Sequence, residues 1–161
     1  MTHLTIVPLS TPASLGVAAQ IAILNARRLF LQTDAHHSAQ WIKSSGVAYT
    51  SMDDLYGECF DFDELNDAIA ARLMCGQDAV YAVPGRGPGQ AQLSAILKAA
   101  EENGVAVKLM PGTGYAEAAC AEAGLAYGSL TICAANDLPQ RIDPFTPLCV
   151  EEIDTPIRAG E

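Results

Sequence analysis

Ala79-Val80-Tyr81-Ala82-Val83-Pro84-Gly85-Arg86-Gly87-Pro88-Gly89-Gln90 is the stretch of sequence that decides the fold. A short apolar run passes directly into a loop that is rich in glycine and proline, and a helical pattern follows at once. The stretch therefore predicts a buried strand, a tight loop and a helix start. In an open α/β sheet ligands bind at the carboxyl ends of the strands, so this loop is the first candidate for a binding site.

Similar apolar runs, separated by segments with helical spacing, precede and follow this stretch. Asp61 and Glu64 form a capping-box pattern ahead of the apolar stripe Phe62, Leu65, Ile69 and Leu73, which predicts a helix that ends at Gly76. Further helices are expected after an N-cap at Ser14, from Ser38 to Gly46, from the glycine loop to Gly104, and from Tyr115 to Ala123. Strands are expected at residues 4–9, 29–31, 47–52, 79–83 and 105–110.

This alternation of strands and helices indicates an α/β fold. We expect an open, mostly parallel sheet of about five strands with helices on both faces, built by residues 1–125. After Gly124 the pattern changes: residues 129–134 and 147–153 look like strands, and a proline-rich connection replaces the helix between them. Residues 126–161 are therefore expected to be a linker and the start of a truncated second lobe.

The composition excludes several classes of function. Nineteen acidic residues against nine basic ones give a net charge of -10, which disfavours a nucleic-acid partner, because phosphate backbones are bound by clustered Lys and Arg. No apolar run reaches the roughly 20 residues of a membrane span, and no signal peptide is apparent. Five widely spaced cysteines without a Cys-x-x-Cys pair are typical of reduced thiols. A soluble cytoplasmic protein without a membrane partner is expected.

The glycine loop matches neither of the common nucleotide-binding motifs. Its third glycine comes one residue too early for the dinucleotide fingerprint, the loop follows the fourth strand instead of the first, and no Gly-Lys-Ser/Thr follows it. Two interpretations remain open. The loop presents backbone N–H groups to an anion or a carboxylate, or its glycines and prolines only make a tight turn.

Catalytic and metal-binding patterns are weak. No Ser or Cys lies in a nucleophile-elbow pattern and no His falls near a glycine loop, so no catalytic residue is assigned. The carboxylates between Asp53 and Glu64 are explained by helix capping and solubility. His36 and His37 are expected to point to opposite sides of an extended segment, and no metal site is expected there.

The order of elements and several short motifs resemble a known family. The motifs are Leu55-Tyr56 after the third strand, Tyr81-Ala82-Val83-Pro84-Gly85 before the loop, and Pro111-Gly112-Thr113-Gly114 at the end of the next strand. They resemble the N-terminal lobe of the tetrapyrrole (corrin and porphyrin) methylases, and most closely the methylase-like domain fused to MazG-type nucleotide pyrophosphohydrolases. The segments Ile142-Asp143-Pro144 and Pro147-Leu148-Cys149-Val150, and then Asp154, are similar to the start of the second lobe in that family.

The resemblance implies a cofactor, a place for it and a set of partners. Members of the family use S-adenosylmethionine, which lies in a cleft between two lobes. A small-molecule ligand, a homodimer and a pyrophosphohydrolase domain that follows this chain are implied as partners. The implied cofactor-binding residues are Pro84, Gly85, Arg86, Gly87 and Pro88 in the first loop, and Gly112, Thr113 and Tyr115 in the second.

The sequence departs from the family pattern at two loops. Residues 8–13 read Pro-Leu-Ser-Thr-Pro-Ala where the family has Gly-x-Gly-Pro-Gly-Asp, and Arg86 stands in place of an acid. Larger side chains narrow a loop that must approach a ligand, and Arg inverts the local charge. The expected function is therefore an S-adenosylmethionine-dependent tetrapyrrole methyltransferase-like domain that is degenerate or incomplete. The alternatives are a non-catalytic dimerisation or regulatory module beside a MazG-type pyrophosphohydrolase, and an unrelated nucleotide-binding α/β domain.

Overall fold

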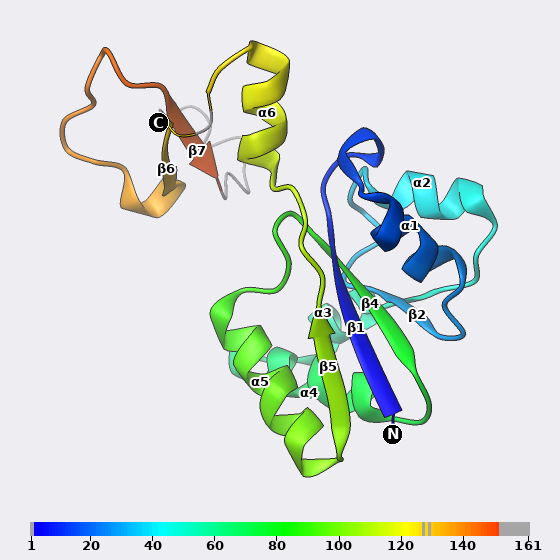
Figure 1. Cartoon of the computed structure of the whole chain (residues 1–161). Coiled ribbons are helices and arrows are strands. Elements are labelled where there is room, and N and C mark those ends of the chain that lie inside the picture. The colour runs from blue at the N-terminus through cyan, green and yellow to red at the C-terminus, as the bar shows by residue number, and fades with distance from the viewer. Residues whose placement is uncertain (1, 127, 129, 152–161) are drawn as a thin grey trace. The chain divides into compact units, whose positions relative to one another are not determined.

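The computed structural model describes residues 2–126, 128 and 130–151, and the chain divides into two compact units, Met1–Gly114 and Tyr115–Glu161 (Figure 1). Each unit is described by itself. In the described part of the chain, no helix combines the length and the apolar character that crossing a membrane requires. The five cysteines are free thiols.

The first unit is built on one parallel sheet of five strands in the order β3-β2-β4-β1-β5 (Figure 1). The fold class expected from the sequence is confirmed. Because all five strands run in the same direction, their carboxyl ends lie along a single edge of the sheet. The strands are β1 (Thr2–Leu9), β2 (Leu29–Leu31), β3 (Thr50–Ser51), β4 (Ala79–Pro84) and β5 (Val105–Leu109).

Helices cover both faces of this sheet, as the sequence predicted. α1 (Val17–Leu24) and α2 (Ala39–Ser45) supply side chains to the core on one face. α3 (Asp53–Glu58), α4 (Phe62–Met74) and α5 (Gln90–Glu102) supply side chains to the core on the other face (Figure 1). A short 3-10 helix, η1 (Pro12–Ser14), lies between β1 and α1.

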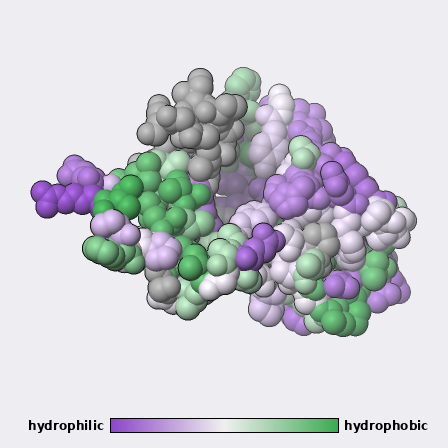
Figure 2. Space-filling model, turned by 90° about the horizontal axis from the view of Figure 1, so that it is seen from above, coloured by the Kyte–Doolittle hydropathy of each residue, from purple (hydrophilic) through white to green (hydrophobic). Residues whose placement is uncertain are grey.

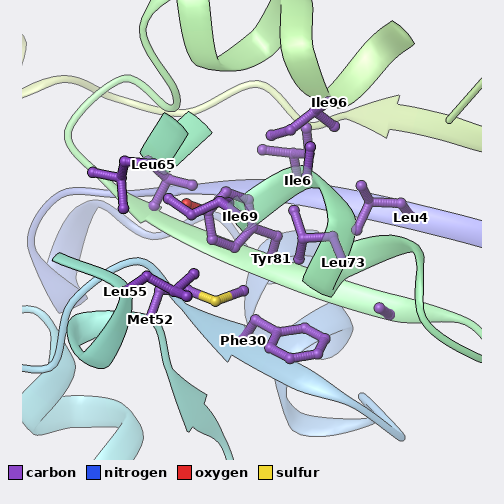
Figure 3. Packing of buried hydrophobic residues seen from close by; sticks show 13 residues of the cluster. Leu4, Ile6, Phe30, Met52, Leu55, Leu65, Ile69, Leu73, Tyr81 and Ile96 are labelled. Carbon is purple, nitrogen blue, oxygen red and sulfur yellow. The ribbon is translucent and has the colours of Figure 1, made fainter. Parts of the chain in front are cut away.

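The two central strands alternate their side chains between the two cores. Along β1, Leu4 and Ile6 join the core under α4 and α5, whereas Val7 and Leu9 join the core under α1 and α2. Figure 3 shows Leu4 and Ile6 beside Tyr81 of β4 and the α4 residues Ile69 and Leu73. Strands that are buried on both faces are near-continuously apolar, which is why the run from Ala79 to Val83 is readable in the sequence.

The capping box at the start of α4 is confirmed. The Asp61 carboxylate accepts a hydrogen bond of 2.8 Å from the Glu64 N–H, and the Glu64 carboxylate accepts one of 2.8 Å from the Phe60 N–H. Leu65, Ile69 and Leu73 are buried as expected, but Phe62 is 78% exposed. Phe62 is the first residue of the helix, where its side chain lies away from the buried stripe.

Two other local expectations were wrong, and one helix was missed. The N-cap of α1 is Gly16, because Ser14 belongs to η1 and its hydroxyl bonds within the loop after β1. The third strand covers only Thr50–Ser51 of the expected residues 47–52, because it is an edge strand that pairs with the three-residue β2 alone. Directly after it, Asp53–Glu58 forms the short helix α3, which the sequence analysis did not anticipate.

The second unit contains α6 (Tyr115–Ala123), β6 (Thr131–Ala134), a 3-10 turn at Ala135–Asp137, and β7 (Leu148–Glu151). β6 and β7 pair in parallel, with Thr131 opposite Leu148. Both strands were expected, although Ser129 and residues 152–153 of the expected ranges lie outside the described residues. The domain boundary between residues 125 and 126 stays a prediction.

Candidate functional site

The candidate site lies at the carboxyl ends of the adjacent strands β1 and β4, whose following loops leave toward opposite faces of the sheet. β1 and β4 are neighbours, with Leu9 opposite Pro84 at their carboxyl ends. The loop after β1 leads to α1 on one face of the sheet, whereas the loop after β4 leads to α5 on the other face. Two adjacent loops that depart to opposite faces mark a switch point, which is where ligands of open α/β sheets bind.

The backbone of the loop after β4 explains two of its glycines. Gly85 has a φ of 73° and Gly87 a φ of 112°, a region of backbone conformation that residues with a side chain rarely adopt. The Gly85 N–H donates a hydrogen bond of 2.5 Å to the Leu9 carbonyl, which ties this loop to the end of β1. The tight turn alone therefore explains why these two positions are glycine. Their presence is not by itself evidence that the loop binds a ligand.

The Pro8 ring of β1 lies against both of the glycine-containing loops. A Cβ added at Gly112 would lie 2.4 Å from the Pro8 Cβ and 2.9 Å from its Cγ, whereas one at Gly87 would meet the Pro8 Cγ at an ordinary 3.5 Å. The loop after β5 thus passes so close to Pro8 that only glycine fits at position 112. This packing role of Gly112 was not apparent in the sequence, because residues 8 and 112 are far apart along the chain.

The hydroxyl groups of the loop after β1 form hydrogen bonds within the loop itself. The Ser14 hydroxyl accepts a hydrogen bond of 3.2 Å from the Thr11 N–H, donates one of 3.0 Å to the Thr11 carbonyl, and also bonds to the hydroxyls of Ser10 and Thr11. A cavity of about 10 Å³ beside Ser10 and Thr11 has room for about one water molecule. The hydroxyl groups of this loop are therefore engaged within the loop itself.

The predicted site residues fall into two groups. Pro84 ends β4, Gly85 to Pro88 lie in the loop after it, and Gly112 and Thr113 lie in the loop after β5. Both loops belong to the first unit and begin at the same edge of the sheet. Arg86 is exposed and Gly85 is buried. Tyr115 is the first residue of α6 and belongs to the second unit. The structure brings the first group together, while the role of every residue in binding stays a prediction.

Tyr81 of β4 lies in the core and is fully buried. Its hydroxyl donates a hydrogen bond of 3.5 Å to the Gln92 side-chain carbonyl in the first turns of α5. Burial is the main reason that the pKa of Tyr81 lies far above its ordinary value. Tyr81 therefore stays protonated at physiological pH and is a structural residue instead of a general base.

A polar cluster that the sequence analysis did not identify lies at the carboxyl ends of β2 and β3. The Asp34 N–H donates a hydrogen bond of 2.8 Å to the Asp53 carboxylate, and the Ser51 hydroxyl donates another of 2.5 Å. The Gln32 amide donates to the Tyr56 hydroxyl at 3.1 Å. The signal for this cluster was present, because the polar run that begins at Gln32 directly follows a buried strand.

Replacing Asp53 by asparagine is expected to lower stability in a pH-dependent way. Desolvation raises the pKa of Asp53, but hydrogen bonds from Asp34, Ser51 and Thr33 outweigh it and place the pKa below its ordinary value of 3.8. The stabilisation is therefore present above that value and is lost as the pH falls below it. Urea unfolding should show Asp53→Asn less stable by up to about 1 kcal/mol near neutral pH, with a difference that shrinks progressively as the pH falls below 3.8. A difference that stays constant with pH would contradict this assignment.

The adjacent histidines do not behave as expected from the sequence. The ring centroids of His36 and His37 are 4.0 Å apart, so the expectation that they point to opposite sides was wrong. The chain turns at these residues instead of running extended. Burial, and then the neighbouring His37, hold the pKa of His36 below its ordinary value. Among residues 2–126, 128 and 130–151, no group of three or more His, Cys, Asp or Glu is arranged to hold a metal ion.

The fold of this chain is similar to that of several solved structures. No protein-family model and no curated protein matches the chain. It is similar to a uroporphyrin-III C-methyltransferase from Thermus thermophilus (17% identity, TM-score 0.62, 87% of this chain and 64% of that one). It is also similar to a diphthine synthase (20%, 0.57, 83% and 53%) and to the precorrin-6Y methylase of Archaeoglobus fulgidus (16%, 0.54, 83% and 63%). The chain has the fold of these methyltransferases.

The similarity to these proteins is one of fold, and it covers only part of their length. The identities are too low to carry an activity across, so the comparison establishes the fold of this chain and nothing further about its chemistry. The chain spans 53 to 64% of the length of the three proteins named. The expected methylase fold is thereby confirmed, whereas the comparisons contain nothing that tests the expected fusion to a pyrophosphohydrolase.

Proposed function

We propose that this chain is a degenerate tetrapyrrole methyltransferase-like domain, which binds S-adenosylmethionine at the carboxyl edge of its sheet. One observation carries the proposal: in a fold shared with methyltransferases, the glycine loop after β4 lies at the switch point beside β1. A corrin or porphyrin acceptor, a homodimer and a cytoplasmic location belong to the same proposal, by resemblance.

The loop after β4 fits such a cofactor. A Cβ added at Gly89 would meet no atom within 4 Å, so the backbone there is open to an approaching ligand. Gly89 is also the N-cap of α5 and supplies no side-chain cap, which leaves the first N–H groups of the helix available to the cofactor's carboxylate or ribose oxygens. When bound, S-adenosylmethionine would supply a methyl group on a positively charged sulfur, and residues 85–89 would hold and orient it.

Two features explain why we propose weak or absent methyl transfer. The guanidinium of Arg86 adds a positive charge to a loop that is to hold a sulfonium cation, which disfavours binding electrostatically. In addition, the hydroxyls of Ser10, Thr11 and Ser14 bond to one another within the loop after β1. That loop does not fit the cofactor, because its polar groups are engaged internally.

The same closed loop favours a second candidate function. Pro8 lies against Gly112, and the loop after β1 bonds to itself, which is the arrangement expected of a domain that keeps the fold without a ligand. Such a domain would act as a dimerisation or regulatory module beside a MazG-type pyrophosphohydrolase. It would form a stable dimer in light scattering and bind no small ligand.

Isothermal titration calorimetry separates these candidates. We expect S-adenosylmethionine and S-adenosylhomocysteine to bind weakly, with the neutral thioether of the latter bound more tightly because Arg86 repels the sulfonium. Arg86→Asp should reverse that order, and Lys108→Asp is a charge-matched control on β5. Absence of heat with both compounds would contradict the proposal. Binding of a nucleotide or a flavin instead would favour the unrelated nucleotide-binding domain.

A further inference from the structure

The first unit exposes aromatic side chains beside a pocket that is separate from the glycine loops. Phe60 is 97% exposed, Phe62 78% and Tyr56 43%. Together with the half-buried Cys59, these residues form what we call the aromatic patch. They line a pocket of about 380 Å³ together with Asp61 and with the buried Leu65.

This patch is unlike the other exposed apolar residues. Figure 2 shows hydrophobic residues at several places on the surface that is seen from above, and scattered residues of this kind are normal. The aromatic patch differs because Phe60 and Phe62 flank a recess that reaches down to the core residue Leu65. Contiguous apolar surface around a recess is typical of interaction sites.

The border of the aromatic patch is strongly acidic. Residues 44–71 contain no Lys or Arg, and Arg72, the next residue, forms an ion pair of 2.7 Å with Asp54. The pKa of the Cys59 thiol is raised by desolvation first, and then by the charges of Glu64, Glu58 and Asp61, so these carboxylates act directly at the patch. Asp61 and Glu64 also cap α4, whereas Glu58 and Asp63 are exposed side chains that the capping box does not use. The carboxylates of this segment are Asp53, Asp54, Glu58, Asp61, Asp63, Glu64 and Asp67.

We propose that the aromatic patch docks a basic, amphipathic segment of a partner protein. Apolar side chains of that segment fill the pocket between Phe60 and Phe62, and its Lys or Arg side chains face Glu58 and Asp63. The combination of an apolar recess and an acidic border is complementary to a basic amphipathic helix. A second copy of this chain is disfavoured as the occupant, because each copy carries a net charge of -10 and the acidic borders would face each other.

A binding assay with a synthetic probe tests this proposal. The probe is a fluorescent peptide of about 18 residues, or five helical turns, with Leu on one face and Lys on the other, and binding is followed by anisotropy. We expect the Phe60→Ser/Phe62→Ser variant to bind at least about tenfold more weakly. The matched control, Val17→Ser/Ile21→Ser, removes two exposed apolar side chains of α1 and should bind as the unmodified chain does.

A second pair of variants separates local from general electrostatic attraction. Glu58→Lys/Asp63→Lys should weaken binding strongly, whereas Glu101→Lys/Glu102→Lys, with the same change in net charge at the end of α5, should weaken it much less. Equal losses in the two pairs, or full affinity in Phe60→Ser/Phe62→Ser, would overturn the proposal. A concentration-dependent dimer that the Phe60→Ser/Phe62→Ser change abolishes would also overturn it, because a second copy would then occupy the patch. Unchanged circular dichroism of the exposed-site variants excludes misfolding as the cause.

Discussion

Replacing Gly112 by alanine is expected to destabilise the first unit by about 3 kcal/mol. The added Cβ would lie 2.4 Å from the Pro8 Cβ, closer than two non-bonded carbon atoms can approach. The obstacle is a proline ring on β1, which is held between β4 and β5, so neither side can move without disturbing the sheet. Urea unfolding, monitored by circular dichroism, measures this loss.

A matched substitution and a double variant test whether Pro8 causes the loss. Gly57 lies in α3, and a Cβ there would meet no atom within 4 Å, so Gly57→Ala should be neutral or stabilising by about 0.5–1 kcal/mol. Pro8→Gly removes the obstructing ring, and Gly112→Ala should then cost much less in that background. Equal effects of Gly112→Ala and Gly57→Ala would show that the loop after β5 does not pack on Pro8.

Replacing Ile69 by alanine is expected to lower the free energy of unfolding by about 4 kcal/mol. Ile69 lies in the middle of α4 and is fully buried in the cluster that includes Leu4, Ile6 and Tyr81 (Figure 3). The substitution removes apolar area and leaves a cavity, because the surrounding strands are fixed by their ladders and relax only partly.

The control for this substitution is the same change in another helix. Ile21 lies in α1 and is 54% exposed, so Ile21→Ala should cost less than about 1 kcal/mol. Both substitutions replace isoleucine by alanine within a helix, so the change in helix propensity is the same. The difference between their losses in free energy of unfolding therefore measures the burial of Ile69 against the sheet. A similar loss in both variants would contradict the placement of α4 on the sheet.

The sequence predicted those parts of the fold that depend on local patterns. The strand from Ala79 and the helix that begins after Asp61 were identified because their burial and capping act over a few residues. Phe62 was expected to face the core and does not, because the spacing alone does not show where the buried stripe begins. The third strand was overestimated, because its length depends on a partner strand, β2, that lies elsewhere in the sequence.

The candidate site was predicted in outline and not in detail. The sequence shows that the loop after β4 follows the end of a strand. It does not show that Pro8 lies beside this loop and packs closely against Gly112, because both contacts depend on the order of the strands in the sheet. The cluster of Asp34 and Asp53 was missed for the same reason, because the two residues meet only when β2 and β3 pair. The polar run after β2 marks one half of that cluster in the sequence, but nothing local shows that Asp53 is its partner.

Amide chemical-shift mapping with S-adenosylhomocysteine tests the central claim most directly, because it reports both binding and its place. We expect the amide signals of residues 85–87, 89, 110, 112 and 113 to shift progressively with added ligand, while those of residues 56–62, which carry the aromatic patch, stay unchanged. Shifts confined to other parts of the chain, or none at millimolar ligand, would contradict a cofactor site at the carboxyl edge of the sheet.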